Sequence, residues 1–178
     1  MTTRLERLAR RIDANLDRLL ETLRAMTPEQ RSFEPGGDAW SVNQVAHHLL
    51  LVQSISVGVM EKNRGRQSAR RNLRQRLGRI GVAMVLGLGI KVRNPAPPTT
   101  PDPEITFEEL EPRWSEERAR FGGLVASMDD ASLGEAGFKH PISGPLTVGE
   151  SLDFLACHLE HHLKQIERIR ALPGFPAA

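Results

Sequence analysis

The stretch TVGESLDFLACHLEHHLKQIERIRAL, from Thr147 to Leu172, predicts a long amphipathic helix near the end of the chain. It opens with a capping box, in which the Thr147 hydroxyl satisfies a backbone amide and Glu150 reaches back to the cap. Apolar residues then recur every three or four positions and share one stripe: Val148, Leu152, Leu155, Leu159, Leu163 and Ile166. A stripe of this kind must be buried against other helices.

Three further segments predict long helices. Residues 41–62 and 106–128 begin with the capping boxes SVNQ and TFEE, and residues 3–26 carry leucine and isoleucine at helical spacing. A fourth capping box, TPEQ at Thr27, precedes a short helical or turn segment over 28–33, and another is expected over 129–133. Because no segment alternates convincingly like a strand, the sequence predicts an all-α protein, a four-helix bundle.

Composition is consistent with this fold. The 178 residues fit a single domain spanning 1–178, with 39% hydrophobic and 26% charged residues. The chain has no tyrosine and two tryptophans, so aliphatic side chains must form most of the core. This favours helices over a β-sandwich, which is richer in β-branched and aromatic residues.

Several features predict a soluble, cytoplasmic protein. The N-terminus is charged and amphipathic, unlike a secretory signal. The longest apolar run, residues 80–90, is shorter than the roughly 20 residues of a membrane-spanning helix. The single cysteine, Cys157, cannot form an internal disulfide, which fits a reducing compartment.

A long connection, residues 63–104, separates the second and third long helices. It includes most of a basic segment, residues 62–93, which carries ten of the 24 basic residues and no acidic residue. The remaining 14 basic residues face 22 acidic ones, so the positive charge is concentrated in this segment. The connection ends in the proline-rich NPAPPTTPDPE, which cannot form a regular helix.

The basic segment allows two interpretations. It could contact an anionic partner, either nucleic acid or a membrane surface. It could instead be a solvated face, or pair with the acidic remainder of the chain or of a dimer mate. No aromatic residue accompanies it to stack on bases, so we expect nucleic-acid and membrane binding to be the weaker alternative.

The histidines of the last helix are not equivalent. His158 and His162 are four residues apart and lie one above the other, on the shoulder of the apolar stripe. His161 is displaced around the helix, and we expect it to face solvent. Side chains at this spacing have Cβ atoms about 5–6 Å apart, so the two imidazoles can converge on one ion.

The second long helix offers a third ligand. Its sequence VAHHLLLVQ places His48 within the apolar stripe, whereas His47 points nearly the opposite way. Placing the residues on a helical wheel therefore selects His48, His158 and His162 as a candidate metal site. Three imidazoles suit Zn²⁺, Ni²⁺ or Fe²⁺, and three protein ligands leave coordination positions open, as catalytic sites do. The alternative is that these are hydrogen-bonded core histidines without a metal.

Other polar residues near the site have weaker signals. Gln165 could orient a ligand or a histidine, or be a surface amide, and Cys157 is predicted to be a small packed residue. Trp40 is predicted to anchor the start of the second long helix. No general base is placed by spacing, since Asp153, Glu160 and Glu167 lie off the histidine line, and His140, before Pro141, has no evident partner.

Two motifs resemble those of the DinB-like (YfiT-like) superfamily of four-helix bundles. WSVNQVAHHL, residues 40–49, resembles the family's Trp-Ser start of the second helix followed by His-Leu. GPLT at residues 144–147, followed by His158, His162 and Gln165, resembles the entry into the last helix and its His-x-x-x-His-x-x-Gln pattern. The resemblance covers most of the chain except about residues 63–103.

The resemblance implies a divalent metal in the bundle core, bound by His48, His158 and His162. It further implies a metal-dependent hydrolase, or a thiol-dependent transferase or isomerase that uses a low-molecular-weight thiol, and a homodimer. The alternative function is a non-catalytic binding or stress-associated module, in which the basic segment contacts an anionic partner. An embedded His48 favours the enzyme, whereas the lack of an evident base favours the module.

Overall fold

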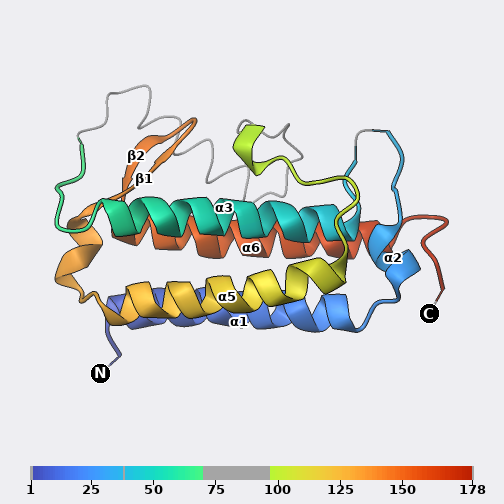
Figure 1. Ribbon diagram of the computed structural model, residues 1–178, viewed down its shortest axis with the longest axis horizontal. Helices are drawn as coiled ribbons and strands as arrows, with labels where there is room; N and C mark the ends of the chain where they lie inside the picture. Colours follow the sequence, from blue (N-terminus) through green and yellow to red (C-terminus); the bar gives the residue numbers. More distant parts are fainter. Residues whose placement is uncertain (1, 38, 70–96, 178) are drawn as a thin grey trace.

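The computed structural model describes residues 2–37, 39–69 and 97–177, and its four long helices are arranged in two layers (Figure 1). They are α1 (Arg4–Arg24), α3 (Val42–Lys62), α5 (Phe107–Ala126) and α6 (Val148–Arg170). In Figure 1, α3 and α6 form one layer and α1 and α5 the other. Helices α1 and α6 run in one direction and α3 and α5 in the opposite one. The predicted all-α four-helix bundle is confirmed.

The helix starts follow the predicted local chemistry. Complete capping boxes begin the short helix α2 (Pro28–Ser32) and the helices α3, α5 and α6, at the four predicted positions. A fifth box, between Thr3 and Glu6, begins α1 and was not predicted. Each box satisfies two backbone amides that a helix N-terminus leaves unpaired, so these starts are set by local sequence. The predicted segment at 129–133 is the 3-10 turn η2 (Ala131–Gly134).

Aliphatic side chains fill the space between the layers, as composition predicted. The side chains with the least exposure include Trp114 and residues from every long helix, among them Ile12, Leu16, Leu19, Leu23, Val42, Val45, Leu110, Leu152 and Ile166. Burial of large aliphatic side chains contributes about 1.5–3 kcal/mol each relative to exposure. The core therefore holds the two layers in a fixed relation.

The expectation that the chain lacks strands was wrong. Residues 136–147 form a β-hairpin, in which β1 (Ala136–His140) pairs antiparallel with β2 (Gly144–Thr147), with His140 opposite Gly144. These strands are too short, and too irregular between Ala136 and Lys139, to alternate recognisably in sequence. Gly144 has φ +74°, a conformation that favours glycine and completes the turn.

The hairpin packs directly on the start of α6. A Cβ added to Gly137 would lie 2.6 Å from the carbonyl oxygen of Thr147, so only glycine allows this approach. In addition, Ser151 of α6 accepts a hydrogen bond from the amide of Phe138 at 3.3 Å. The hairpin thus covers the outer face of the α3–α6 layer (Figure 1).

The long connection is described only at its two ends. Residues 97–99 form a single 3-10 turn, η1 (Pro97–Thr99), within the proline-rich sequence. The apolar run at 80–90 and most of the predicted basic segment lie outside the described residues. Among the helices that the structure describes, none is both long and apolar enough to cross a membrane.

Arg31 joins three helices at one end of the bundle. Its side chain is buried, and Nη1 donates to the carbonyl oxygens of Leu23 and Met26 at 3.1 and 2.6 Å. Nη2 donates to Glu108 of α5 at 2.9 Å, and the guanidinium lies over the ring of Phe107. Arg31 therefore satisfies carbonyls at the end of α1 while linking α2 to α5.

We expect Arg31→Ala to lower the free energy of unfolding by about 2–4 kcal/mol, because it leaves two buried carbonyl oxygens without a hydrogen-bond donor and removes the packing of the side chain. Urea denaturation measures the change. Arg24→Ala is the matched control, since the Arg24–Glu111 ion pair is exposed and contributes less than about 1 kcal/mol. Equal effects of the two substitutions would contradict the structural role of Arg31.

Candidate metal centre

Three imidazoles converge between α3 and α6. His48 lies in the first half of α3, and His158 and His162 lie one turn apart on α6, which runs antiparallel to α3. Nε2 of His158 is 3.4 Å from Nε2 of His48 and 3.1 Å from Nε2 of His162. All three ligand atoms lie within 4.8 Å of one another. The structure thus brings together the three histidines that helical spacing selected.

Hydrogen bonds fix the orientation of two of these rings. Nδ1 of His48 lies 2.7 Å from the carbonyl oxygen of Thr99, which can only accept, so His48 carries its proton on Nδ1. Nδ1 of His162 is 2.8 Å from Oε1 of Gln165, and it donates in the same way. In their neutral forms both rings therefore direct an Nε2 lone pair toward His158. Gln165 has the orienting position that was one of its two predicted roles.

Burial keeps the three imidazoles uncharged. Their residues are 5%, 9% and 7% exposed in chain order. Loss of hydration lowers the pKa of His162 to about 3, that of His158 well below its usual value, and that of His48 in the same direction. A metal ligand must be neutral imidazole, so these pKa shifts leave the site ready to bind a cation at neutral pH.

The spacing suits a small divalent cation. Two nitrogens bound tetrahedrally to Zn²⁺ at about 2.0–2.1 Å are about 3.3 Å apart. The separations of 3.4 and 3.1 Å agree with that value. Without a cation, lone pairs of three neutral rings would face one another with at most one proton between them. The donor set therefore fits a divalent metal ion, and nitrogen ligands suit Zn²⁺, Ni²⁺ or Fe²⁺.

Aromatic rings line the histidines. The Trp40 ring lies 4.9 Å from that of His48, measured between ring centroids, and Phe154 stacks on His158 at 5.2 Å with an interplanar angle of 17°. Trp40 is partly buried against the core, as predicted for an anchor, but its contact with His48 was not foreseen. The role of Phe154 had no sequence signal beyond its position one turn before His158.

His47 holds the returning end of the long connection. It is not one of the three converging histidines, as its position on the helix predicted, yet it is buried. Its Nδ1 accepts a hydrogen bond from the amide of Asp102 at 3.1 Å. Since neighbouring His48 donates to Thr99, the two adjacent histidines bind the connection at two points, and no sequence motif predicts this role.

The expectation that His161 faces solvent was wrong. His161 is 8% exposed, and its ring lies edge-on to His162 with centroids 5.0 Å apart. A helical wheel locates a side chain relative to its own helix and takes no account of the segments packed over that helix. His161 nevertheless stands outside the group of converging ligand atoms, as predicted.

The acidic residues of this part of α6 are engaged elsewhere. Arg11 of α1 pairs with Asp153 at 3.0 Å and Glu160 at 2.8 Å, on the face toward α1. Arg11 also donates to the Sγ atom of Cys157 at 3.3 Å, and burial raises the pKa of that thiol. Cys157 is thus a half-buried packed residue rather than an activated nucleophile. The arrangement agrees with the prediction that these acids lie off the histidine line.

His140, which had no predicted partner, is buried at the tip of the hairpin. Its Nδ1 accepts hydrogen bonds from the amides of Ile142 and Ser143, each at 3.1 Å, and so organises the turn. The ring packs against Phe154 with centroids 5.0 Å apart. Burial lowers the pKa of His140 to about 4.

Comparison with known proteins identifies the family. The sequence model of the DinB superfamily matches residues 11–166, so the chain belongs to the DinB superfamily, as its motifs predicted. The crystal structure of TT2238, described as a four-helix bundle protein, aligns with a TM-score of 0.61 and 22% identity over 92% of this chain and 98% of that chain. That likeness supports the fold. A comparison with curated proteins gave no match.

The low pKa of His140 predicts that the metal-free protein loses stability in mild acid. The unfolded chain takes up a proton near pH 6.5, whereas folded His140 does so only near pH 4. The contribution of neutral His140 to the free energy of unfolding is therefore fully present above pH 6.5. It declines as the pH falls toward 4, by about 1.4 kcal/mol per pH unit. Urea unfolding at pH 7.5, 6.0 and 5.0 measures the total slope, to which the three site histidines also contribute because burial lowers their pKa values too.

His140→Asn supplies the comparison, because its side-chain oxygen can still accept from the turn amides but does not titrate. We expect its stability to fall less steeply than that of the unsubstituted protein between pH 6 and 5. Identical slopes for the two proteins would contradict the assignment of a buried, neutral His140.

Proposed function

We propose that this DinB superfamily protein is a metal-dependent enzyme acting on a small molecule, with one divalent cation bound by His48, His158 and His162. The observation that supports it is the convergence of three buried Nε2 atoms, two of them turned inward by hydrogen bonds at Nδ1. Such orienting acceptors are typical of histidines that bind metals. A merely structural core would not require three imidazoles to face one another.

The donor set defines the chemistry of the proposed site. Three protein ligands leave coordination positions for a substrate, where a divalent cation supplies Lewis-acid chemistry to an oxygen or holds a thiol as its thiolate. The three imidazoles are neutral, so the loaded site carries a net positive charge and favours an anionic ligand. Two reaction classes fit this description, hydrolysis and transfer of a low-molecular-weight thiol, and a homodimer is the expected assembly.

The proposal predicts one bound metal ion per chain, lost when any of the three histidines is replaced. We expect His48→Ala and His158→Ala to be purified with little metal, because a two-histidine site binds weakly. His47→Ala is the matched control, since it removes the adjacent histidine of the same helix and should retain the ion. Elemental analysis after dialysis measures the metal content.

A folded, unsubstituted protein that binds no Zn²⁺, Ni²⁺ or Fe²⁺ would contradict the metal site. The catalytic part of the proposal is tested with the same proteins, by comparing hydrolysis of aryl esters and conjugation of a small thiol to an electrophile. Turnover that requires the metal and disappears in His158→Ala supports an enzyme. Metal binding without turnover of either substrate class would instead indicate a binding module.

The hydrogen bond of Gln165 to His162 predicts that Gln165 contributes to metal affinity. We expect Gln165→Leu to weaken binding about 10- to 100-fold, because loss of an orienting partner frees the ring and its tautomer. Competition with a chelator of known affinity gives the dissociation constant. Glu167→Leu, at an exposed position on the same helix, should leave it unchanged; equal effects would contradict an orienting role.

A further inference from the structure

The segment that leads into α5 is held against the helix that supplies His48. We call residues 97–104 the strap. Its 3-10 turn η1 packs on α3, on the outer side of the layer that α3 forms with α6 (Figure 1). Thr99 and Pro101 of the strap are buried, whereas the residues on either side of them are exposed. The strap therefore rests on α3 through alternate residues, close to the three-histidine cluster.

The strap has little regular structure of its own to hold it in place. Four of its eight residues are proline, which fixes φ but offers no N–H. The Thr100 amide donates to the carbonyl of Pro97 at 3.0 Å and closes η1, and the Glu104 amide donates to the side chain of Asp102 at 3.0 Å. Because these bonds are internal to the strap, its attachment to the bundle depends on contacts with other side chains.

Two adjacent histidines of α3 provide hydrogen bonds for that attachment. The carbonyl oxygen of Thr99 accepts from Nδ1 of His48 at 2.7 Å, and the amide of Asp102 donates to Nδ1 of His47 at 3.1 Å. The His48 bond is buried, and it joins the strap to a ring whose other nitrogen converges with the other two histidines of the cluster. One imidazole therefore links the strap to the candidate metal centre.

That imidazole carries an effect from one of its nitrogens to the other. Coordination at Nε2 withdraws electron density from the ring, so Nδ1–H becomes a stronger hydrogen-bond donor. Conversely, a carbonyl that accepts from Nδ1–H fixes the tautomer that leaves the Nε2 lone pair available, and raises its basicity as a ligand. A cation and the Thr99 carbonyl therefore each strengthen the interaction of the other with His48.

We propose that the strap is coupled to the metal centre: a cation bound by His48 holds the strap closed on α3, and the closed strap raises the affinity for the cation. In the closed state Thr99 accepts from His48 and Asp102 donates to His47, as in the structure. The inference rests on the proposed metal site and adds a means of regulating it, since pulling the strap from α3 lowers metal affinity. Thr99 is a positioning residue that acts through His48.

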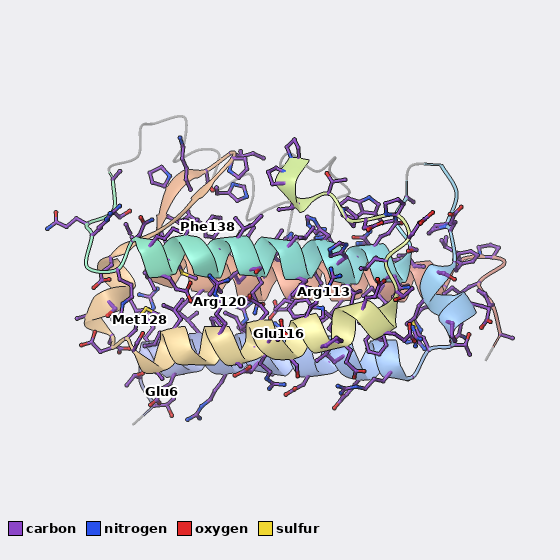
Figure 2. The ribbon with its side chains drawn as sticks, in the orientation of Figure 1. Glu6, Arg113, Glu116, Arg120, Met128 and Phe138 are labelled. Carbon is purple, nitrogen blue, oxygen red and sulfur yellow. The ribbon has the colours of Figure 1, made fainter. Side chains whose placement is uncertain are left out.

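Amide hydrogen exchange of the full chain, followed by NMR with and without Zn²⁺, tests the coupling. We expect zinc to slow exchange of the Thr100 and Asp102 amides about 10- to 100-fold, the factor by which an outer partner typically changes metal affinity. The matched control is the Glu135 amide, which closes the 3-10 turn η2 with a bond of 3.0 Å to Ser132, as Thr100 closes η1. The turn η2 follows Met128, labelled at one end of the bundle in Figure 2. Exchange at Glu135 should change less than about twofold, because local openings of separate segments are independent.

Two variants define the route of the coupling. His162→Ala removes a ligand of the cation and leaves the strap contacts in place, so zinc should no longer slow exchange in the strap. His47→Ala removes the second attachment while all three ligands remain. In that variant the Asp102 amide should exchange rapidly with or without zinc, whereas zinc should still slow exchange at Thr100.

Selective slowing in the strap that is lost in His162→Ala supports the proposal. Unchanged exchange at Thr100 in a protein that binds stoichiometric zinc overturns it and leaves the metal site intact. Equal slowing at Glu135 overturns it as well, because zinc would then stabilise the fold in general. Slowing that persists in His162→Ala, or a Thr100 response that is lost in zinc-bound His47→Ala, overturns the route through His48. If the unsubstituted protein binds no zinc, the three-histidine site fails as a zinc site and this inference fails with it.

Discussion

Burial of three uncharged imidazoles between α3 and α6 is the constraint on which the rest of the site depends. Hydration of a charged ring is lost there, and the pKa of His158 is driven well below its usual value. Neutral rings in an apolar layer need partners for both nitrogens. Thr99 and Gln165 provide the outer partners of His48 and His162, and the inner nitrogens of the three rings face one another at a spacing that suits a cation. The chemistry of the site follows from this burial.

Two irregular segments complete what the helices begin. The returning end of the long connection is fixed by His47 and His48, adjacent residues of α3 that bond to Asp102 and Thr99. The hairpin brings His140 and Phe138 over the same layer, and Phe154 links them to His158 by ring contacts. Both segments rely on side chains of α3 and α6 for their position, so the helices organise the loops as well as the ligands.

Local chemistry explains why so much was predictable. A capping box involves residues three apart, and an i, i+4 pair lies on one helix, so both can be recognised without tertiary information. That is why the helix starts and the pairing of His158 with His162 agree with the structure. The predictions that failed concern long-range packing. His161 is buried by segments that a helical wheel does not take into account. The hairpin depends on the close approach of Gly137 to the start of α6 and has no recognisable alternation of apolar and polar residues.

The sequence by itself determined four amphipathic helices, their starts, and the choice of one inward histidine from α3 and two from α6, because helical periodicity fixes which side chains share a face. Only the tertiary structure decided how those faces meet. Antiparallel packing of α3 on α6 places His48 at the level of His158, with their Nε2 atoms 3.4 Å apart. It also decided which atoms orient the rings, since the Thr99 carbonyl lies 51 residues from His48 and only the folded chain brings the two together.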